Sequence, residues 1–336
     1  MKAIGYTEPG TVARTDALVM RELPDPVAKS RDLLIRVAAV SVNPVDTKLR
    51  MNAPPSGGFG VLGYDAVGTI EAVGPDVTLF RSGDRVWYAG SIARPGTNSE
   101  LHLVDERIVG PAPSTLSDAD AAALPLTAIT AWEMLFDRFD VARPVARDNR
   151  TILIIGGAGG VGSIAIQIAK RVAGMTVVAT ASRPETVEWV RQMGADHVVD
   201  HSKPLAPQIA ALGVGPPGFV FSTTETERHF DDIVELIAPQ GRLGVISGIG
   251  KSAADKLSGK SIALHFELMF TRSNLQTVDM VEQHHLLSEV ARLVGAGTLE
   301  TTRTEHFGRI TPENLKRAHA LVESGKARGK VVLEGF

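Results

Sequence analysis

The chain has 336 residues, of which 44% are hydrophobic and 22% charged, and its formal net charge is -3 at pH 7. This length is sufficient for two domains with cores of their own, and the composition is that of an ordinary globular protein. The small negative charge gives no reason to expect nucleic acid or an anionic membrane as a partner, and the absence of cysteine excludes disulfides, thiolate nucleophiles and cysteine zinc ligands.

The first residues, MKAIGY, begin directly as a strand, without the charged and then apolar pattern of a signal segment. No apolar stretch reaches the length needed to cross a membrane. We therefore expect a cytoplasmic α/β protein.

The first third of the chain is predicted to be a small β domain. Short β-prone runs alternate with Gly, Pro and Asp, which is typical of an antiparallel, barrel-like domain. The predicted strands are residues 2–6, 19–23, 33–40, 68–73, 84–88 and 101–104. Two stretches between them, 41–48 (SVNPVDTK) and 57–65 (GGFGVLGYD), contain too many loop-forming and polar residues for core strands. We predict loops there, in the positions on a barrel where ligand contacts usually lie.

Two helices are predicted at the end of this β domain. Ser117 and Asp120 form the pattern of a capping box, which opens a helix that runs on through an Ala-rich segment. The second helix spans 124–132, with Pro125 in its first turn, and marks the change of domain. Residues 143–150 are predicted to form a surface loop before the next strand.

The most informative stretch is 151–163, TILIIGGAGGVGS. Its apolar run indicates a strand buried on both faces, and a helical pattern follows the glycines. Gly157, Gly159 and Gly162 match G-x-G-x-x-G between strand and helix, the context in which this motif binds a dinucleotide. Glycines allow a tight turn and let backbone N–H groups approach a pyrophosphate at the positive end of the helix. The alternative is a glycine-rich turn that binds nothing.

Strands and helices alternate after this turn. Predicted strands are 175–181, 197–200, 219–222 and 243–247, and predicted helices are 184–193, closed by Gly194, and 229–237. This rhythm predicts a parallel, doubly wound sheet. Toward the C-terminus we predict helices at 281–294 and 312–324 and a last strand at 329–333.

The end of the second strand of this sheet indicates which nicotinamide dinucleotide binds. A carboxylate there holds the adenosine ribose of NAD, whereas an Arg accommodates the extra phosphate of NADP. The strand ends in Ser182 and Arg183, and Glu185 lies inside the following helix. The fork of Arg and the hydroxyl of Ser suit a phosphate, so NADP(H) is favoured. The alternative for Arg183 is an exposed residue at the start of a helix.

The sequence resembles the medium-chain dehydrogenase/reductase superfamily over essentially its whole length. The resemblance is carried by segments 41–48, 63–68 (GYDAVG), 82–86 (SGDRV), 157–162, 193–197 (MGADH) and 329–333 (GKVVL). It is similar to the quinone oxidoreductase branch, and to the group called zinc-type alcohol dehydrogenase-like. This implies a GroES-like catalytic domain built from residues 1–124 and 269–336, with a Rossmann NADP(H)-binding domain, 125–268, inserted between them.

The positions of zinc ligands differ from those in the alcohol dehydrogenases. Asn43 stands where the first cysteine ligand would be, Tyr64 replaces the histidine, and Asp65 replaces the glutamate beside it. The four-cysteine structural zinc lobe is missing, because residues 89–99 bridge that region without sulfur. We expect no metal. Without a strong Lewis acid, alkoxide formation from an alcohol is disfavoured, whereas quinones and enones already have an electrophilic carbon.

The resemblance therefore implies NADPH-dependent reduction of quinones or activated carbon–carbon double bonds. We expect Asn43, Tyr64 and Thr127 to be catalytic, with Tyr64 donating to the oxygen of the acceptor. Asp46 and Lys48 would orient their loop. Each has a simpler alternative: Tyr64 only packs, Thr127 caps a helix, and Asp46 with Lys48 forms a solvated ion pair.

Further cofactor contacts also follow from the resemblance. They are assigned to Pro44, Asp46, Thr130, Gly160, Val161, Thr180, His201, Ser222, Thr223, Ser247, Gly248, Ile249, Phe270, Arg272 and Lys330. His201 stands where relatives often carry a tyrosine. Residues 262–270 are the candidate edge of a homodimer.

Two rival functions remain at this point. One is an alcohol or aldehyde dehydrogenase, which the missing metal ligands disfavour. The other is a non-catalytic NADPH-binding protein with a structural or sensing role, for which the charge and the few aromatic residues provide no evident surface.

Overall fold

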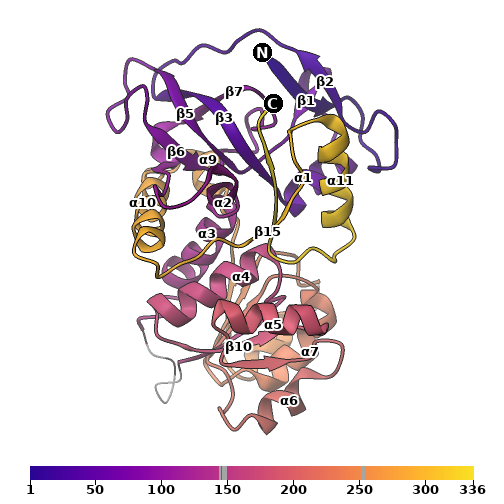
Figure 1. The fold of residues 1–336 in the computed structure, drawn as a ribbon. Helices are drawn as coiled ribbons and strands as arrows, with labels where there is room; N and C mark the ends of the chain where they lie inside the picture. Colours follow the sequence, from indigo (N-terminus) through magenta and orange to yellow (C-terminus); the bar gives the residue numbers. More distant parts are fainter. Residues whose placement is uncertain (144, 146–149, 251–253) are drawn as a thin grey trace. The chain divides into compact units, whose positions relative to one another are not determined.

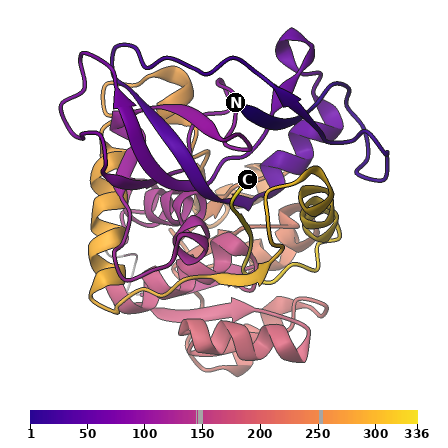
Figure 2. The same ribbon diagram turned by 45° about the horizontal axis from the view of Figure 1, so that its top comes forward.

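The computed structural model describes residues 1–143, 145, 150–250 and 254–336, and they form two compact units. Unit 1 consists of Met1–Ile129 and Phe270–Phe336, and unit 2 consists of Thr130–Met269. Both ends of the chain thus belong to unit 1, where the C-terminal strand lies beside strands from the first hundred residues (Figures 1 and 2). The loop predicted at 143–150 includes positions 144 and 146–149, which lie outside the described residues.

Unit 1 contains two sheets. The larger has the strand order β15-β16-β3-β5-β6-β8, with β7 also paired to β3. Its strands are β3 (Asp32–Val42), β5 (Ala66–Val73), β6 (Arg85–Tyr88), β7 (Leu101–Asp105), β8 (Val109–Pro111), β15 (Arg303–His306) and β16 (Lys330–Glu334). The smaller sheet has the order β2-β1-β4 and comprises β1 (Lys2–Tyr6), β2 (Val19–Glu22) and β4 (Gly60–Val61).

The long strand β3 holds the larger sheet together. Its first half pairs antiparallel with β7, from Asp32 opposite Asp105 to Arg36 opposite Leu101. Its second half pairs antiparallel with β16, where Val42 is opposite Val331. Because β16 comes from the last residues of the chain, this register places Lys330 next to the end of β3.

Helices surround these sheets. They are α1 (Pro44–Asn52), α2 (Asp118–Ala122), α3 (Pro125–Trp132), which continues across the unit boundary, α9 (Thr271–Leu275), α10 (Glu282–Gly295) and α11 (Pro312–Glu323). Helix α11 packs on α1, where the buried Arg50 forms an ion pair with Glu323.

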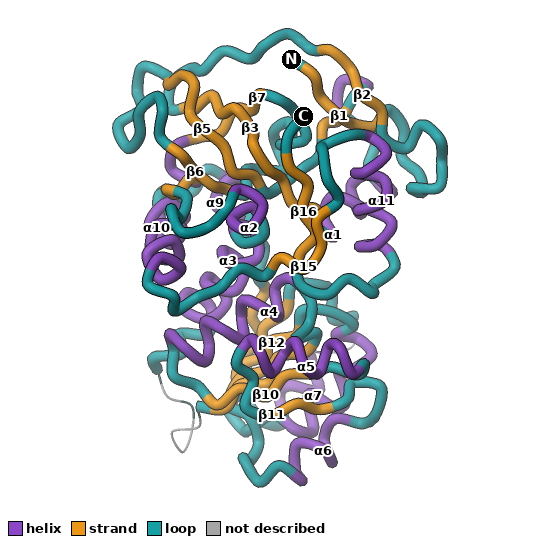
Figure 3. The backbone as a smooth tube through the Cα atoms, in the orientation of Figure 1, coloured by secondary structure: helices purple, strands orange, loops and turns teal. Residues whose placement is uncertain are grey.

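Unit 2 is built on a parallel sheet with the order β11-β10-β9-β12-β13-β14. The strands are β9 (Thr151–Ile155), β10 (Thr176–Thr180), β11 (His197–Val199), β12 (Phe219–Ser222), β13 (Arg242–Val245) and β14 (Ala263–Phe266). Figure 3 labels β10, β11 and β12 among them. The order reverses between β9 and β12, the point at which ligands bind in open α/β sheets. Strand β9 is buried along its whole length, as its apolar run predicts.

The helices of unit 2 are α4 (Gly160–Gln167), α5 (Pro184–Met193), α6 (Leu205–Ala211), α7 (Thr226–Leu236) and α8 (Ala254–Ser258), with π-helical turns at Glu133–Arg138 and Ile168–Val172. Helix α7 buries Thr226, His229, Phe230, Ile233 and Leu236, a spacing that puts one face toward the sheet. This face joins the core formed by the parallel strands.

The predicted α/β fold class is confirmed. Most predicted helices and strands differ only at their ends, but β4 lies within the stretch 57–65 that was predicted as a loop, and β8, α6, α8, α9 and β15 were not predicted. The prediction of a loop at residues 44–48 was wrong, because these residues form the first turns of helix α1. Asn43 and Asp46 form a capping box and Pro44 occupies the first helical position. Asn, Pro and Asp favour loops inside an element, but at these positions they start a helix. Among the described residues, no helix has the length and apolar character needed to span a membrane.

Candidate functional site

The glycine turn between β9 and α4 leaves a helix N-terminus open. Gly156 has a φ of 78°, and α4 begins at Gly160 with Gly159 as its N-cap. A Cβ on Gly162 would lie 2.3 Å from the carbonyl oxygen of Gly156, so the helix can approach the turn only without a side chain there. The first backbone N–H groups of α4, including those of Gly160 and Val161, are thus available for an anion. This arrangement fits the pyrophosphate of a dinucleotide.

Polar groups are linked at the ends of β10 and β11. The backbone N–H of Gly156 donates to Thr180 Oγ1 at 3.0 Å, and His201 Nδ1 lies 3.2 Å from the same oxygen. His201 Nε2 lies 3.1 Å from Ser182 Oγ. Three residues predicted to contact the cofactor, Thr180, Ser182 and His201, therefore form one hydrogen-bonded group that starts at the glycine turn.

Arg183 precedes helix α5 at the edge of this group. Its Nε lies 3.3 Å from Glu185 Oε1, and both side chains are about half exposed (41% and 54%). Its backbone N–H donates to Thr186 Oγ1, which fixes the start of α5. An exposed ion pair of this kind is weak, so a phosphate can compete for the guanidinium.

A second hydrogen-bonded set of side chains, all with hydroxyl groups, lies at the ends of β12 and β13. Ser222 Oγ is 2.8 Å from Thr226 Oγ1, which is 3.2 Å from Ser247 Oγ, and Gly248 and Ile249 follow directly. Thr223 Oγ1 donates to the carbonyl of Ile155 at 2.8 Å. Sequence reasoning missed Thr226, which joins the two predicted serines; its position in the first turn of the helix after Ser222 was the available signal.

In unit 1, a buried polar cluster holds the segment that follows β3. Asp46 accepts hydrogen bonds from the backbone N–H groups of Asn43 at 2.7 Å and Gly63 at 2.9 Å. It thereby joins the start of α1 to the segment that carries Tyr64. Burial, the dominant cause, raises the pKa of Asp46 to about 7, although both backbone donors oppose this shift.

Asp65 and Lys330 complete this cluster. Asp65 Oδ2 accepts from Asn43 Nδ2 at 2.7 Å and from the Lys330 ammonium at 2.9 Å, and its Oδ1 accepts from the N–H of Leu126 at 2.7 Å. The ammonium also donates to Asn43 Oδ1 and to the carbonyl of Val42. Burial raises the pKa of Asp65, and the Lys330 charge opposes this. Lys330 was expected to contact the cofactor, but its ammonium instead bonds to Asn43 and Asp65. We call Asn43, Asp46, Asp65 and Lys330 the buried cluster.

Tyr64 lies beside this buried cluster. Its side chain is 4% exposed and its ring packs edge-on against Phe270, with 5.5 Å between ring centroids. Burial is the main cause that raises the pKa of the hydroxyl. Within the described residues no hydrogen bond satisfies this hydroxyl, so it remains able to donate to a ligand.

Thr127 and Arg272, also predicted for this region, already have partners within the protein, and Thr130 and Pro44 lie on helices. Thr127 donates to the carbonyl of Leu124 at 3.1 Å, and Thr130 is buried one turn further along α3. Arg272 forms an ion pair with Asp279 at 3.1 Å. Pro44 is the first residue of α1 and is exposed.

Comparison with known proteins identifies both parts of the chain. Residues 29–114 match the model of the alcohol dehydrogenase GroES-like domain, and residues 160–295 match that of the zinc-binding dehydrogenases. A zinc-type alcohol dehydrogenase-like protein from Staphylococcus aureus (strain MSSA476) is 42% identical over 339 residues, which cover 99% of each chain. The chain belongs to the medium-chain dehydrogenase/reductase superfamily.

Within this superfamily, other relatives differ in what their names state. A 2-methylene-furan-3-one reductase from Solanum lycopersicum is 37% identical over 213 residues, 60% of this chain and 53% of that protein. A solved structure from Rhizobium etli CFN 42, whose name assigns it to the zinc-dependent alcohol dehydrogenases, is 58% identical, covers 100% of this chain and 98% of its own, and gives a TM-score of 0.98. A mycobacterial structure complexed with NADPH is 26% identical over 99% of both chains, with a TM-score of 0.84.

The zinc that these names imply does not fit the side chains at the ligand positions. The amide of Asn43 and the carboxylate of Asp65 are bonded to one another and to the Lys330 ammonium, so a positive charge already contacts both groups. A tyrosine with a raised pKa is a poor zinc ligand compared with a histidine or thiolate. Over the described ranges, there is no group of three or more His, Asp or Glu side chains that could hold a metal.

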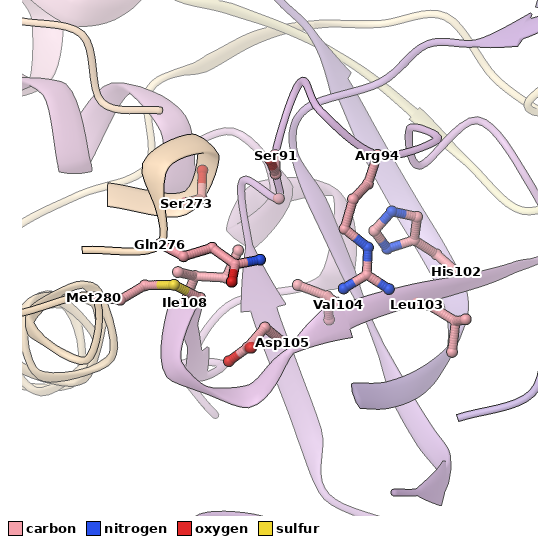
Figure 4. A pocket seen from close by; sticks show the side chains of 11 residues that line it. Ser91, Arg94, His102, Leu103, Val104, Asp105, Ile108, Ser273, Gln276 and Met280 are labelled. Atoms are coloured by element: carbon pink, nitrogen blue, oxygen red, sulfur yellow. The ribbon is translucent and has the colours of Figure 1, made fainter. Parts of the chain in front are cut away.

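A small pocket in unit 1 is bordered by residues 90, 91 and 94, in the stretch 89–99 that was expected to stand in place of a structural zinc lobe. Figure 4 shows Arg94 and His102 on one side of the pocket and Gln276 and Met280 on the other. Arg94 forms an ion pair with Asp32 at 2.8 Å. Both ring nitrogens of His102 have hydrogen-bond partners, and burial lowers its pKa to about 4. These polar side chains therefore support the fold of this segment.

Proposed function

We propose that the protein is an NADPH-dependent oxidoreductase that transfers hydride to quinones or activated enones without a catalytic metal. The observation that carries the metal-free part is the contact of the Lys330 ammonium with both Asn43 and Asp65. The name of the 2-methylene-furan-3-one reductase from Solanum lycopersicum supports the reaction class, and the mycobacterial structure complexed with NADPH supports the cofactor.

Unit 2 would hold the cofactor through its backbone and hydroxyl groups. The open N-terminus of α4 would bind the pyrophosphate, and Ser182, Arg183 and His201 would bind the adenosine phosphate. The hydroxyl groups of Thr223 and Ser247, and residues Gly248 and Ile249, would contact the nicotinamide ribose side. When bound, the dihydronicotinamide supplies the hydride, and these contacts fix where its reactive carbon lies.

Unit 1 would supply a hydrogen-bond donor to the oxygen of the quinone or enone. As hydride reaches the electrophilic carbon, negative charge develops on the acceptor oxygen. The unsatisfied hydroxyl of Tyr64 would donate to that oxygen, and the buried position of the ring would reduce competition by water. The high pKa of this hydroxyl keeps it protonated at neutral pH, so it acts as a hydrogen-bond donor.

Asn43, Asp46 and Lys330 would position Tyr64. Asp46 ties the Asn43 backbone to Gly63, the residue before Tyr64, and Lys330 ties Asn43 to Asp65, the residue after it. The segment 63–65 is therefore fixed at both ends. Thr127, whose hydroxyl proton is given to Leu124, would shape the pocket through its methyl group and its remaining acceptor capacity.

Cofactor preference provides a direct test. Replacing Arg183 with Glu should lower the ratio of NADPH to NADH kcat/KM by at least about tenfold, because a carboxylate repels the phosphate and can accept from the ribose hydroxyls of NADH. The matched control is Arg191→Glu, the same charge change at the exposed far end of α5. An unchanged ratio in the Arg183 variant would contradict the assignment of the phosphate.

We also propose that two copies associate through β14. This strand is the last in the sheet order, and the nearby side chains of Phe266 and Leu268 are 59% and 56% exposed. An exposed edge of this kind can pair with its own copy about a two-fold axis. Light scattering should give a dimer for the protein and a monomer for Phe266→Lys/Leu268→Lys; a monomeric parent protein would refute this part.

A further inference from the structure

The adenosine-phosphate region has a second basic side that faces His201 from helix α7. The rings of His201 and His229 lie edge to face with their centroids 6.4 Å apart. Arg228, which precedes His229 on α7, is exposed. The positive charge of Arg228 lowers the pKa of both histidines, and that of Arg183 lowers the pKa of His201. Arg183 precedes α5, whereas Arg228 lies on α7 next to His229, whose ring contacts His201.

We propose that Arg228 and His201 complete the adenosine-phosphate site with Ser182 and Arg183, and that His201 takes up a proton when NADPH binds. This inference rests on the proposed NADPH dependence and extends it. It assigns a phosphate contact to α7 and makes the affinity for NADPH depend on pH in a way that the affinity for NADH does not.

The hydrogen bonds of His201 explain how its ring is held ready. Thr180 Oγ1 accepts from the N–H of Gly156, so its own proton can be donated to His201 Nδ1. The neutral ring then donates from Nε2 to Ser182 Oγ, and the proton of Ser182 is available for a phosphate oxygen. Protonation of Nδ1 requires only that the Thr180 hydroxyl rotate and accept, so the ring can become charged without moving.

The charges around His201 favour the neutral ring in the free protein. Burial is the largest cause of its lowered pKa, Asp200 opposes the shift, and Arg228 and Arg183 add to it. Other charged groups nearby are His229, whose pKa is also lowered, Asp232 on α7, Glu225 directly before α7, and Glu185 beside Arg183. A phosphate dianion bound between the two arginines adds negative charge beside the imidazole and favours the protonated ring, so the pKa of His201 rises on binding.

The sign of the pH dependence follows from this shift. Between the pKa of the free protein, which lies below 6.5, and the higher pKa of the complex, binding takes up a proton and NADPH affinity increases as pH falls. Above the higher value the contribution of His201 disappears. NADH carries no such phosphate, so its affinity should be flat over the same range.

Calorimetric titration of the full chain with NADPH and with NADH tests this proposal. At pH 7, titrations in two buffers of different ionisation enthalpy measure the protons exchanged. We expect net proton uptake with NADPH and none with NADH. The His201→Gln variant should lose this proton uptake. Its affinity for NADPH should be about tenfold weaker than that of the parent protein at pH 6.5, and the difference should be smaller at pH 8.5. Arg228→Gln should weaken NADPH binding about tenfold and leave NADH binding unchanged.

Controls separate this proposal from the proposed function and from misfolding. His285→Gln, at an exposed position on α10, should keep both the uptake and the affinity, and unchanged NADH binding shows that a variant is folded. His229→Gln should retain the uptake. Selective NADPH binding without proton uptake, or uptake that persists in His201→Gln, would overturn the inference alone. Equal affinity for NADPH and NADH would overturn the proposed cofactor preference as well.

Discussion

The glycine turn of unit 2 and the buried cluster of unit 1 are prepared for ligands in opposite ways. At the turn, the absence of side chains matters: a Cβ on Gly162 would meet backbone at 2.3 Å, and the N–H groups of α4 stay open. In the cluster, almost every polar atom is engaged, and Lys330 alone contacts Val42, Asn43 and Asp65. The first region offers unused donors, whereas the second uses its donors to hold one unsatisfied hydroxyl, that of Tyr64, in place.

This difference predicts how each region fails when it is changed. Damage to the turn should remove cofactor binding while the fold survives. Damage to the cluster should reduce stability, because buried charges lose their partners.

Replacing Lys330 with Met should give the largest effect on stability. The carboxylate of Asp65 would remain buried without its cation, which costs about 3–5 kcal/mol of unfolding free energy. Chemical denaturation measures this loss, and Lys48→Met, at an exposed position on α1, should change stability by less than about 0.5 kcal/mol. A Lys330 variant as stable as the parent protein would mean that the ion pair does not support the cluster.

Replacing Gly162 with Val should weaken NADPH binding at least about a hundredfold, or roughly 2.7 kcal/mol, because α4 must move away from the turn. Fluorescence titration measures the affinity and circular dichroism the fold. Gly295→Ala is the control, since a Cβ there meets nothing within 4 Å. Tight NADPH binding by the Gly162 variant would contradict the assignment of the pyrophosphate to this turn.

Replacing Tyr64 with Phe should lower kcat with quinones about tenfold and leave the Kd for NADPH unchanged, because only the donor to the acceptor oxygen is lost. Tyr88→Phe, in a buried tyrosine that bonds to His102, should leave kcat unchanged. Equal kcat in the Tyr64 variant and the parent protein would reduce Tyr64 to a packing residue.

The pH dependence of stability tests the protonation of Asp46. Its pKa is raised from about 3.8 to about 7 on folding, so the folded state holds the proton more strongly. Stability from this group is full below pH 4 and is lost as pH rises toward 7, with a slope of at most about 1.4 kcal/mol per pH unit. Relative to the parent protein, Asp46→Asn should remove this slope and the exposed Asp76→Asn should keep it. The same slope in both variants would exclude Asp46 as its source.

The sequence predicted the glycine turn of unit 2 better than the buried cluster of unit 1. The strand β9, the glycines and the ends of α5 and β12 depend on residues close together in the chain, so local patterns predicted them well. The contact of Lys330 with Asn43 spans 287 positions and depends on β16 pairing with β3, which no local pattern contains. Arg228, proposed as a phosphate contact, was missed because no local pattern places α7 beside His201. Thr226 was missed although it lies in the helix turn that follows Ser222.

The helix α1 shows a different limit. Asn43, Pro44 and Asp46 were interpreted as loop formers, but each occupies the position in a helix N-terminus that suits its side chain. The roles of Asn43, Tyr64 and Thr127 toward an acceptor stay predictions.

The most direct measurement is the oxidation of NADPH and NADH, side by side, by protein treated with a chelator and checked for metal content, with a panel of quinones and enones as acceptors. We expect turnover that is selective for NADPH and is unchanged when zinc is added. No turnover despite NADPH binding, or activity that appears only with zinc and an alcohol or aldehyde, would contradict it.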